Sequence, residues 1–215
     1  NNFINDITVL KKLGLTPIVV HGGGPRIKKK LDELNIETKF IMGLRVTNEK
    51  VIKVVEDVMI KFNKEIVNAL EKKICMAKSI TIRENNVIHV QQKNKELGYV
   101  GFPNRIDASI IESLIKENFI PVITPMGLDE KGQIYNVNAD VAAGALATSL
   151  KSRRLMLMTD VEGVYDKNKK LISEINPVEA EKLIHDGTIS EGMIPKIKTC
   201  VNAVENGVKG VVIID

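Results

Sequence analysis

Gly22, Gly23 and Gly24 stand between the apolar residues 18–20 and a basic segment that begins at Pro25. Glycines allow bare backbone N–H groups to approach a bound group closely, and a proline at the first helical position directs the positive end of a helix at that group. These residues therefore predict an anion-binding loop, with a tight strand-to-helix turn that binds no ligand as the alternative.

Other known glycine motifs do not fit this loop. An HGGG segment also forms the oxyanion hole of lipases and esterases, but these enzymes need a G-x-S-x-G nucleophile elbow, and no serine here is flanked in that way. The loop matches neither the Walker form G-x-x-x-x-G-K-[ST] nor the dinucleotide form G-x-G-x-x-G. A standard P-loop or Rossmann fingerprint is therefore excluded.

Arg45, within the segment GLRVT, places a guanidinium beside a predicted helix N-terminus. Such a group binds a carboxylate through two parallel hydrogen bonds. The alternative is a surface arginine followed by an N-cap at Thr47.

Asn136, Asn138 and Asp140 supply two amides and a carboxylate at the start of a helix rich in alanine, where the alternative is a simple N-cap. Lys196 falls in the first turn of a later helix, where a cation opposes the helix dipole. That placement is favourable if an anion lies between the dipole and the lysine, although such a side chain can also point to solvent. Glycine amides, a lysine and a carboxylate together are typical of phosphoryl transfer, which depends on positioning and charge neutralisation.

Apolar periodicity and turn residues predict the elements that position these groups. We expect helices over residues 3–13, after Pro25, from Thr47 to about residue 70, over 107–117 and 139–150, and after Pro177 and Pro195. Strands are expected over residues 17–20, 79–83, 87–91, 120–124, 155–158 and 210–214, with 79–83 and 87–91 paired as a hairpin around Asn85. The alternation predicts an α/β fold with a mostly parallel sheet. Because ligands of such sheets lie beyond the carboxyl ends of the strands, residues 22–24, 136–140 and 159–163 are expected to face one crevice.

The composition limits the class of protein. A chain of 215 residues forms one compact domain, with two lobes around a cleft as one arrangement, and a net charge of +4 does not indicate nucleic-acid binding. Cys75 and Cys200 are far apart, and the three histidines are scattered, so neither a disulfide framework nor a metal site is predicted. No signal peptide or membrane-crossing run is found, which predicts a cytoplasmic protein.

The segments HGGGP, GLRVT, ELGYVG, IPVITPMG, NVNADVAAGALA, TDVEGVYD and EGMIPKI follow one another through nearly the whole chain. In this order and spacing they resemble the acetylglutamate kinases of the amino acid kinase superfamily. The resemblance implies a three-layer α/β/α sandwich with a mostly parallel open central sheet and a β-hairpin in the N-terminal lobe. It also implies an acyl-substrate lobe over about residues 1–150 and a nucleotide lobe over about 151–215. ATP, with Mg²⁺ as cofactor, would phosphorylate the γ-carboxylate of N-acetyl-L-glutamate there, in the second step of arginine biosynthesis.

The same resemblance implies roles for individual residues. Substrate binding would fall to Gly23, Gly24, Arg45, Asn136 and Asn138, with Arg45 on the α-carboxylate and the glycines also near the transferring phosphoryl group. Lys196 would stabilise that group, and Asp140 would orient the catalytic lysines. The nucleotide would lie among Asp160, Val161, Gly163, Val164, Tyr165, Gly192 and Met193. The long helix after Thr47 would form the contact of a homodimer. An arginine-regulated form would be a hexamer, and the nitrogen-signalling PII protein would be a further partner.

Departures from the family pattern leave alternatives open. The family's first strand, with its K-x-G-G lysine, and its C-terminal elements lie outside the chain, so we expect either a fragment of a kinase or a non-catalytic binding protein of the same fold. Residues 76–81 replace a glycine-rich segment of the family's substrate lid. A sister kinase that acts on a carrier-linked aminoadipate in lysine biosynthesis is the other alternative.

Overall fold

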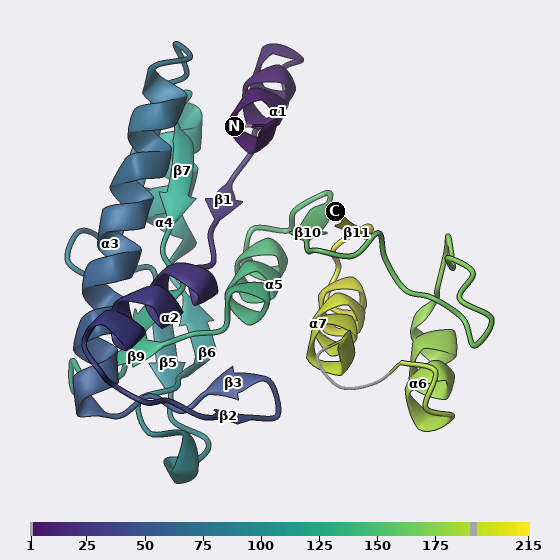
Figure 1. Ribbon diagram of the computed structural model, residues 1–215. Coiled ribbons are helices and arrows are strands. Elements are labelled where there is room, and N and C mark those ends of the chain that lie inside the picture. Colours follow the sequence, from purple (N-terminus) through teal and green to yellow (C-terminus); the bar gives the residue numbers. More distant parts are fainter. Residues whose placement is uncertain (1, 190–192) are drawn as a thin grey trace. The chain divides into compact units, whose positions relative to one another are not determined.

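The computed structural model describes residues 2–189 and 193–215. The chain forms two compact units, unit 1 (Asn1–Ala139) and unit 2 (Asp140–Asp215). Figure 1 labels their helices and strands. No helix among the described residues is long and apolar enough to cross a membrane.

Unit 1 contains most of the elements. Its helices are α1 (Asn2–Lys12), α2 (Gly24–Glu33), α3 (Glu49–Glu71), the 3₁₀-helix η1 (Lys95–Leu97) and α4 (Ala108–Lys116). Its strands are β1 (Val19–Val20), β2 (Phe40–Ile41), β3 (Leu44–Arg45), β4 (Ala77–Ile80), β5 (Ile88–Gln91), β6 (Phe102–Ile106), β7 (Ile120–Ile123), β8 (Met126–Leu128) and β9 (Ile134–Asn136). The four helices predicted for this region are confirmed, whereas β2, β3, β6, β8 and β9 were not predicted.

The central feature of unit 1 is a parallel sheet in the order β1-β7-β4. Every residue of β7 is buried, as expected for a strand with neighbours on both edges and helices packed nearby. A second sheet, β6-β5-β8-β9, contains antiparallel pairs around the parallel pair β5–β8. The prediction of an α/β fold with open, mostly parallel sheets is confirmed.

The predicted hairpin between residues 79–83 and 87–91 is wrong. β4 pairs in parallel with β7, and β5 pairs with β6 and β8, so the two strands belong to different sheets. The turn signal itself is real, because Asn85 adopts a positive φ of 65° and two hydrogen bonds join the backbones of Thr81 and Glu84. The destination of β4 is set by burial of Ala77 beside β7, which the local turn sequence does not encode. Residues 76–81 therefore do not form a lid hairpin.

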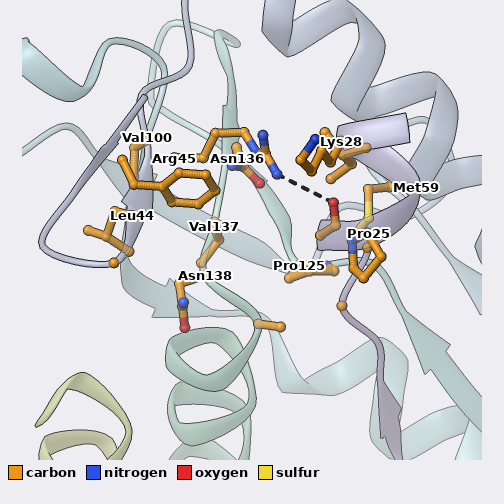
Figure 2. A pocket seen from close by; sticks show the side chains of 17 residues that line it. Pro25, Lys28, Leu44, Arg45, Met59, Val100, Pro125, Asn136, Val137 and Asn138 are labelled. Carbon is orange, nitrogen blue, oxygen red and sulfur yellow. Dashed lines mark hydrogen bonds between the residues drawn. The ribbon is translucent and has the colours of Figure 1, made fainter. Parts of the chain in front are cut away.

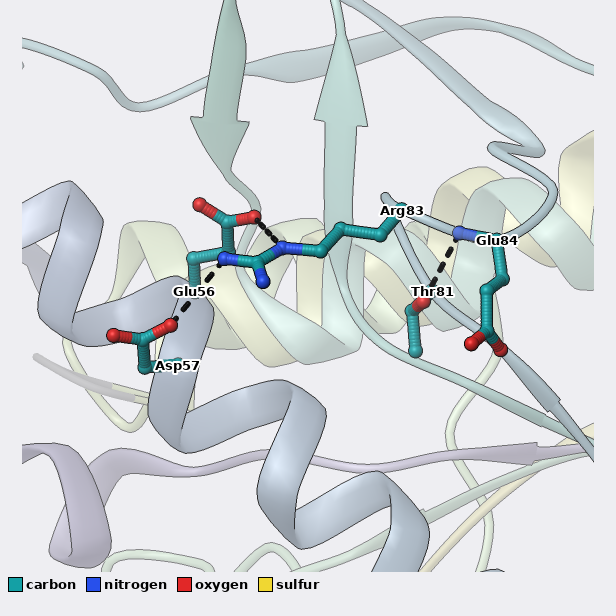
Figure 3. Close-up of polar contacts among 5 residues, drawn as sticks. All are labelled: Glu56, Asp57, Thr81, Arg83 and Glu84. Carbon is teal, nitrogen blue, oxygen red and sulfur yellow. Dashed lines mark hydrogen bonds and ion pairs between the residues drawn. The ribbon is translucent and has the colours of Figure 1, made fainter.

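The turn after β4 is attached to α3 by charged groups (Figure 3). Arg83 Nε lies 2.7 Å from Glu56 Oε1, and Arg83 Nη2 lies 3.4 Å from Asp57 Oδ1. The Arg83 side chain is 61% exposed, so water and salt screen this pairing and it adds little to stability. These contacts raise the pKa of Arg83, chiefly through the hydrogen bond to Glu56.

Helix α3 supports both cores of unit 1. It begins after Asn48, whose side chain accepts hydrogen bonds from the backbone N–H groups of Lys50 and Val51, so the N-cap is not Thr47. Its first half packs with α2 and Met126, and its second half packs with α1 and the parallel sheet. The apolar face of this helix, to which the family resemblance assigns a homodimer contact, is therefore largely occupied within unit 1.

Unit 2 has a parallel strand pair packed with helices. It comprises α5 (Ala139–Ser149, of which Ala139 belongs to unit 1), β10 (Leu155–Met158), α6 (Pro177–His185), α7 (Met193–Glu205) and β11 (Val211–Ile214). β10 and β11 pair in parallel from Leu155↔Val211 to Met158↔Ile214. The predicted start of α6 is confirmed, because the helix begins at Pro177 and the N-cap residue Asn176 forms a capping box with Glu179 at the third helical position. Helix α7 begins at Met193, two residues before Pro195.

Candidate functional site

A pocket of about 510 Å³ opens in unit 1 between the glycine loop, β3 and the segment that follows β9 (Figure 2). Gly23, Gly24, Arg45, Asn136 and Asn138, the predicted substrate-binding residues, all line it. Residues 40–45 and 136–139 come from distant parts of the sequence, so this clustering is a result of folding. The glycine loop leaves the carboxyl end of β1, where the ligand rule for open sheets places a site.

The glycine loop lies directly on α3. A Cβ atom at Gly23 would lie 2.3 Å from the Met59 sulfur, so this close approach of backbone to helix requires glycine. Gly23 is the N-cap of α2, with Pro25 in the first helical positions, and no described side chain caps this helix end. The positive end of α2 therefore faces a part of the pocket wall built of bare backbone.

Arg45 contributes a positive charge to the same pocket. Its Nη1 donates to Thr38 Oγ1 at 2.9 Å, its Nη2 donates to the Gly24 carbonyl at 3.3 Å, and its guanidinium lies 4.7 Å from the centre of the Phe40 ring. Burial lowers the pKa of Arg45, partly offset by Asp32, but the group stays charged at neutral pH. Both acceptors are uncharged, and no described carboxylate forms an ion pair with Arg45. The pocket is therefore suited to an anionic ligand.

Thr47 joins two of the predicted substrate residues, a role that the sequence did not reveal. It is fully buried, its hydroxyl donates to the Arg45 carbonyl at 2.9 Å, and it accepts from Asn136 Nδ2 at 3.5 Å. Its backbone also bonds to Leu97 O and Tyr99 N. The only hint in the sequence was its position two residues after Arg45, where the N-cap explanation competed.

Lys196 and Asp140 form a second group of charged residues, in unit 2. Lys196 Nζ lies 2.8 Å from Asp140 Oδ2, and the two side chains are 12% and 29% exposed. Asp140 lies in the first turn of α5, where the helix dipole favours a carboxylate. The protein itself thus supplies an anion beside Lys196, and the lysine side chain does not simply point to solvent.

Close packing between α5 and α7 holds this ion pair. A Cβ atom at Gly144 would lie 2.6 Å from Thr199 Cγ2, and the Thr199 hydroxyl donates to the Pro195 carbonyl at 3.0 Å. One turn after Lys196, Cys200 is half-buried, and burial raises the pKa of its thiol to about 11. That thiol is therefore protonated at neutral pH and is a poor nucleophile.

The residues predicted to lie around the nucleotide are all in unit 2. Asp160, Val161, Gly163, Val164 and Tyr165 follow the carboxyl end of β10, and Met193 begins α7, whereas Gly192 lies outside the described residues. Gly163 has a φ of 156°, Val164 is buried, and the Tyr165 hydroxyl donates to Glu162 at 3.0 Å. Of the three loops expected at one crevice, residues 22–24 and 136–139 line the pocket of unit 1. The position of residues 159–163 beside them remains a prediction.

Comparisons with known proteins give a consistent picture. The sequence profile of the amino acid kinase family matches residues 1–215. Acetylglutamate kinase from Pelagibacter ubique (strain HTCC1062) is 57% identical over 213 residues, which cover 99% of this chain and 74% of that protein. Acetylglutamate kinase from Bartonella bacilliformis is 44% identical over 227 residues, covering 99% of this chain and 75% of that protein. A crystal structure of smu.665 from Streptococcus mutans UA159 matches with a TM-score of 0.92 at 30% identity, covering 99% of this chain and 87% of that one.

Proposed function

Since the chain belongs to the amino acid kinase family, we propose that it phosphorylates the γ-carboxylate of N-acetyl-L-glutamate with ATP, in the second step of arginine biosynthesis. The observation that carries this proposal is Arg45, a cation without a carboxylate partner among the described residues, in a pocket that is also lined by the glycine loop. The acetylglutamate kinases among the similar proteins support the choice of substrate.

The pocket of unit 1 suits an acid with two carboxylates. Arg45 has five N–H donors, of which Thr38 and Gly24 occupy two, so donors remain for one carboxylate of the ligand. The glycine loop and the start of α2 offer backbone N–H groups to the other carboxylate, the one that receives the phosphoryl group. Asn136 lines the same pocket, with a side-chain amide that can bond to the substrate.

We assign the phosphoryl donor to unit 2. Residues 159–165 would surround the nucleotide, and Lys196 would neutralise the negative charge that develops as the carboxylate oxygen bonds to phosphorus and the bond to ADP breaks. Asp140 fixes the position of the Lys196 ammonium. The described residues contain no group of three or more His, Cys, Asp or Glu side chains that could hold a metal ion. We therefore assign Mg²⁺ to the phosphates of ATP, which is its usual place in kinases.

A hydroxamate assay for acyl phosphate tests the proposal directly. With MgATP, we expect product from N-acetyl-L-glutamate and none from a carrier-linked aminoadipate. Product from the carrier-linked substrate alone would identify the lysine-pathway enzyme instead. No product from either substrate, together with calorimetric binding of N-acetyl-L-glutamate, would indicate a non-catalytic binding protein.

We also propose that the protein is a homodimer. For an arginine-regulated form we propose a hexamer, and we propose the PII protein as a further partner. This proposal is supported by the family resemblance alone. The apolar face of α3 does not add support, since it is largely occupied inside unit 1. Light scattering at micromolar concentration tests the homodimer, and a monomeric mass would contradict it.

A further inference from the structure

A buried polar chain runs beneath the glycine loop. His21, the residue before the loop, is 6% exposed, and Asn63 in the middle of α3 is fully buried. Asn63 Nδ2 lies 3.2 Å from His21 Nε2 and 2.9 Å from the Val122 carbonyl. On the other side of the ring, His21 Nδ1 lies 3.3 Å from the Gly22 carbonyl. Three distant segments, β7, α3 and the glycine loop, are thus connected through the Asn63 amide and the His21 imidazole.

The chemistry of these atoms determines where the imidazole proton is. The Val122 carbonyl only accepts hydrogen bonds, so the side-chain NH₂ of Asn63, and not its oxygen, must face it. The same NH₂ faces His21 Nε2, which must therefore accept a hydrogen bond and carry no proton. The proton of the neutral ring is then on Nδ1, where it is donated to the Gly22 carbonyl.

The surroundings of the ring agree with this assignment. Burial is the largest effect and lowers the pKa of His21 to about 4, with Arg26 contributing in the same direction. Phe62 contacts the imidazole edge to face, with ring centroids 5.1 Å apart, and Arg26 stacks 3.9 Å from the centre of the Phe62 ring. The imidazole is therefore neutral at physiological pH and fixed in orientation.

The Gly22 carbonyl belongs to the same peptide unit as the Gly23 N–H. No peptide bond among the described residues is cis, so in this unit the C=O and the N–H point in opposite directions. A hydrogen bond that holds the carbonyl toward the buried imidazole also directs the Gly23 N–H to the other side. Both glycines line the pocket of unit 1.

We propose that His21 is a positioning residue that, held by Asn63, fixes the peptide between Gly22 and Gly23 so that the Gly23 N–H faces the anion in the pocket. The identity of that anion, the phosphoryl group as it passes to the substrate carboxylate, rests on the proposed function. A donor that is already oriented stabilises developing charge without reorganisation, so its loss lowers kcat more than substrate affinity.

Two substitutions of His21 separate the two ring nitrogens. Asparagine has its NH₂ on Cγ, where Nδ1 is attached, so His21→Asn keeps the donor to the Gly22 carbonyl. Glutamine extends its NH₂ toward the place of Nε2, so His21→Gln loses that donor. We expect His21→Gln to lower kcat about 10- to 100-fold, with both KM values within about threefold, and His21→Asn to stay within about fivefold of the wild-type kcat. Equal losses in the two variants, or no loss in either, would overturn the proposal.

Nitrogen-15 NMR of the imidazoles tests the proposal without using enzyme activity. The chain has three histidines, so the His21 signals are those that disappear in His21→Asn. We expect a neutral ring with its proton on Nδ1, and a Gly23 amide resonance that moves in His21→Gln and much less in His21→Asn. A proton on Nε2, or a charged ring at neutral pH, would overturn the proposal. An inactive wild-type protein would count against the proposed function alone, since these signals are read in the absence of substrate.

Discussion

Arg45 in unit 1 and Lys196 in unit 2 are both partly buried cations in predicted sites, but their partners differ in kind. Within residues 2–189 and 193–215, the acceptors of Arg45 are the neutral oxygens of Thr38 and Gly24. Lys196 forms an ion pair with Asp140 at 2.8 Å. The first cation therefore lacks a counter-charge among the described residues, whereas the charge of the second is balanced within the protein.

This difference separates binding from catalysis. An unbalanced cation in a half-buried pocket gains most from a ligand that brings a full negative charge, so its contribution appears in substrate affinity. A cation that is already paired gains little from a ground-state anion, but it is held in place for charge that develops during the reaction. Substitutions at the two positions should therefore change different kinetic constants.

Lys196→Ala should have the largest effect. Loss of one oriented charge from the transition state lowers kcat by roughly two to four orders of magnitude, with both KM values within a few-fold. Lys198→Ala, an exposed lysine on the same helix, is the matched control and should leave kcat unchanged. Steady-state kinetics with circular dichroism decide the matter. A folded Lys196→Ala protein with more than about a third of wild-type kcat would remove Lys196 from the catalytic group.

Arg45→Ala should weaken binding of N-acetyl-L-glutamate and leave the KM for ATP nearly unchanged. A bidentate charged hydrogen bond at a half-buried site contributes about 2 to 4 kcal/mol, or roughly 30- to 900-fold in KM. Arg83→Ala is the matched arginine control in the same unit, because Arg83 is exposed and paired with Glu56 and Asp57. If Arg45→Ala changed the KM for ATP and not that for acetylglutamate, the comparison between the two cations would be wrong.

Part of this arrangement follows from local sequence. The glycine loop, the proline at the start of α2 and the capping box of α6 depend on neighbouring residues, so their types and spacing are enough to predict them. Contacts between distant segments are different. Asn136 in β9 and Arg45 in β3 line one pocket because the fold brings these two strands near each other. Their assignment to one substrate came from the family resemblance and not from periodicity.

The errors have a common physical cause. β4 is followed by residues typical of a hairpin turn, yet it pairs with β7 because that pairing buries its apolar residues. The sequence offered Thr47 only as a capping residue, and it carried no signal for Asn63. Their roles depend on burial and on the atoms that face them, which a single sequence does not contain.

Acidification should lower the stability of the protein, because the buried His21 imidazole of unit 1 is held neutral in the folded state. His21 has a pKa of about 4 in the folded protein against about 6.5 when unfolded, so between these values only the unfolded state binds the proton. The free energy of unfolding should therefore fall as the pH drops from 6.5 to 4, by about 3 kcal/mol at most. Arg26, which stacks on Phe62 beside the imidazole, forms an ion pair with Glu65 at 2.7 Å.

Denaturant unfolding of the wild type and His21→Asn at several pH values measures this contribution. Other carboxylates lose stability in acid in both proteins, so the informative quantity is the difference between the two curves. We expect the wild type to lose about 2 kcal/mol more than His21→Asn between pH 7 and pH 4.5. Parallel curves would show that His21 is not held neutral.

Thr47→Val should have the smallest effect and should sharpen the assignment of unit 1 to the acceptor. Valine has nearly the same shape as threonine, but it removes the hydroxyl that donates to the Arg45 carbonyl and accepts from Asn136. The loss of this link is worth about 1 kcal/mol, which corresponds to roughly a fivefold increase in the KM for acetylglutamate, with the KM for ATP and kcat little changed. Thr47→Ser keeps the hydroxyl and should restore most of the affinity. If serine were as damaging as valine, or if both KM values rose together, Thr47 would act through packing alone and not by orienting Arg45 and Asn136.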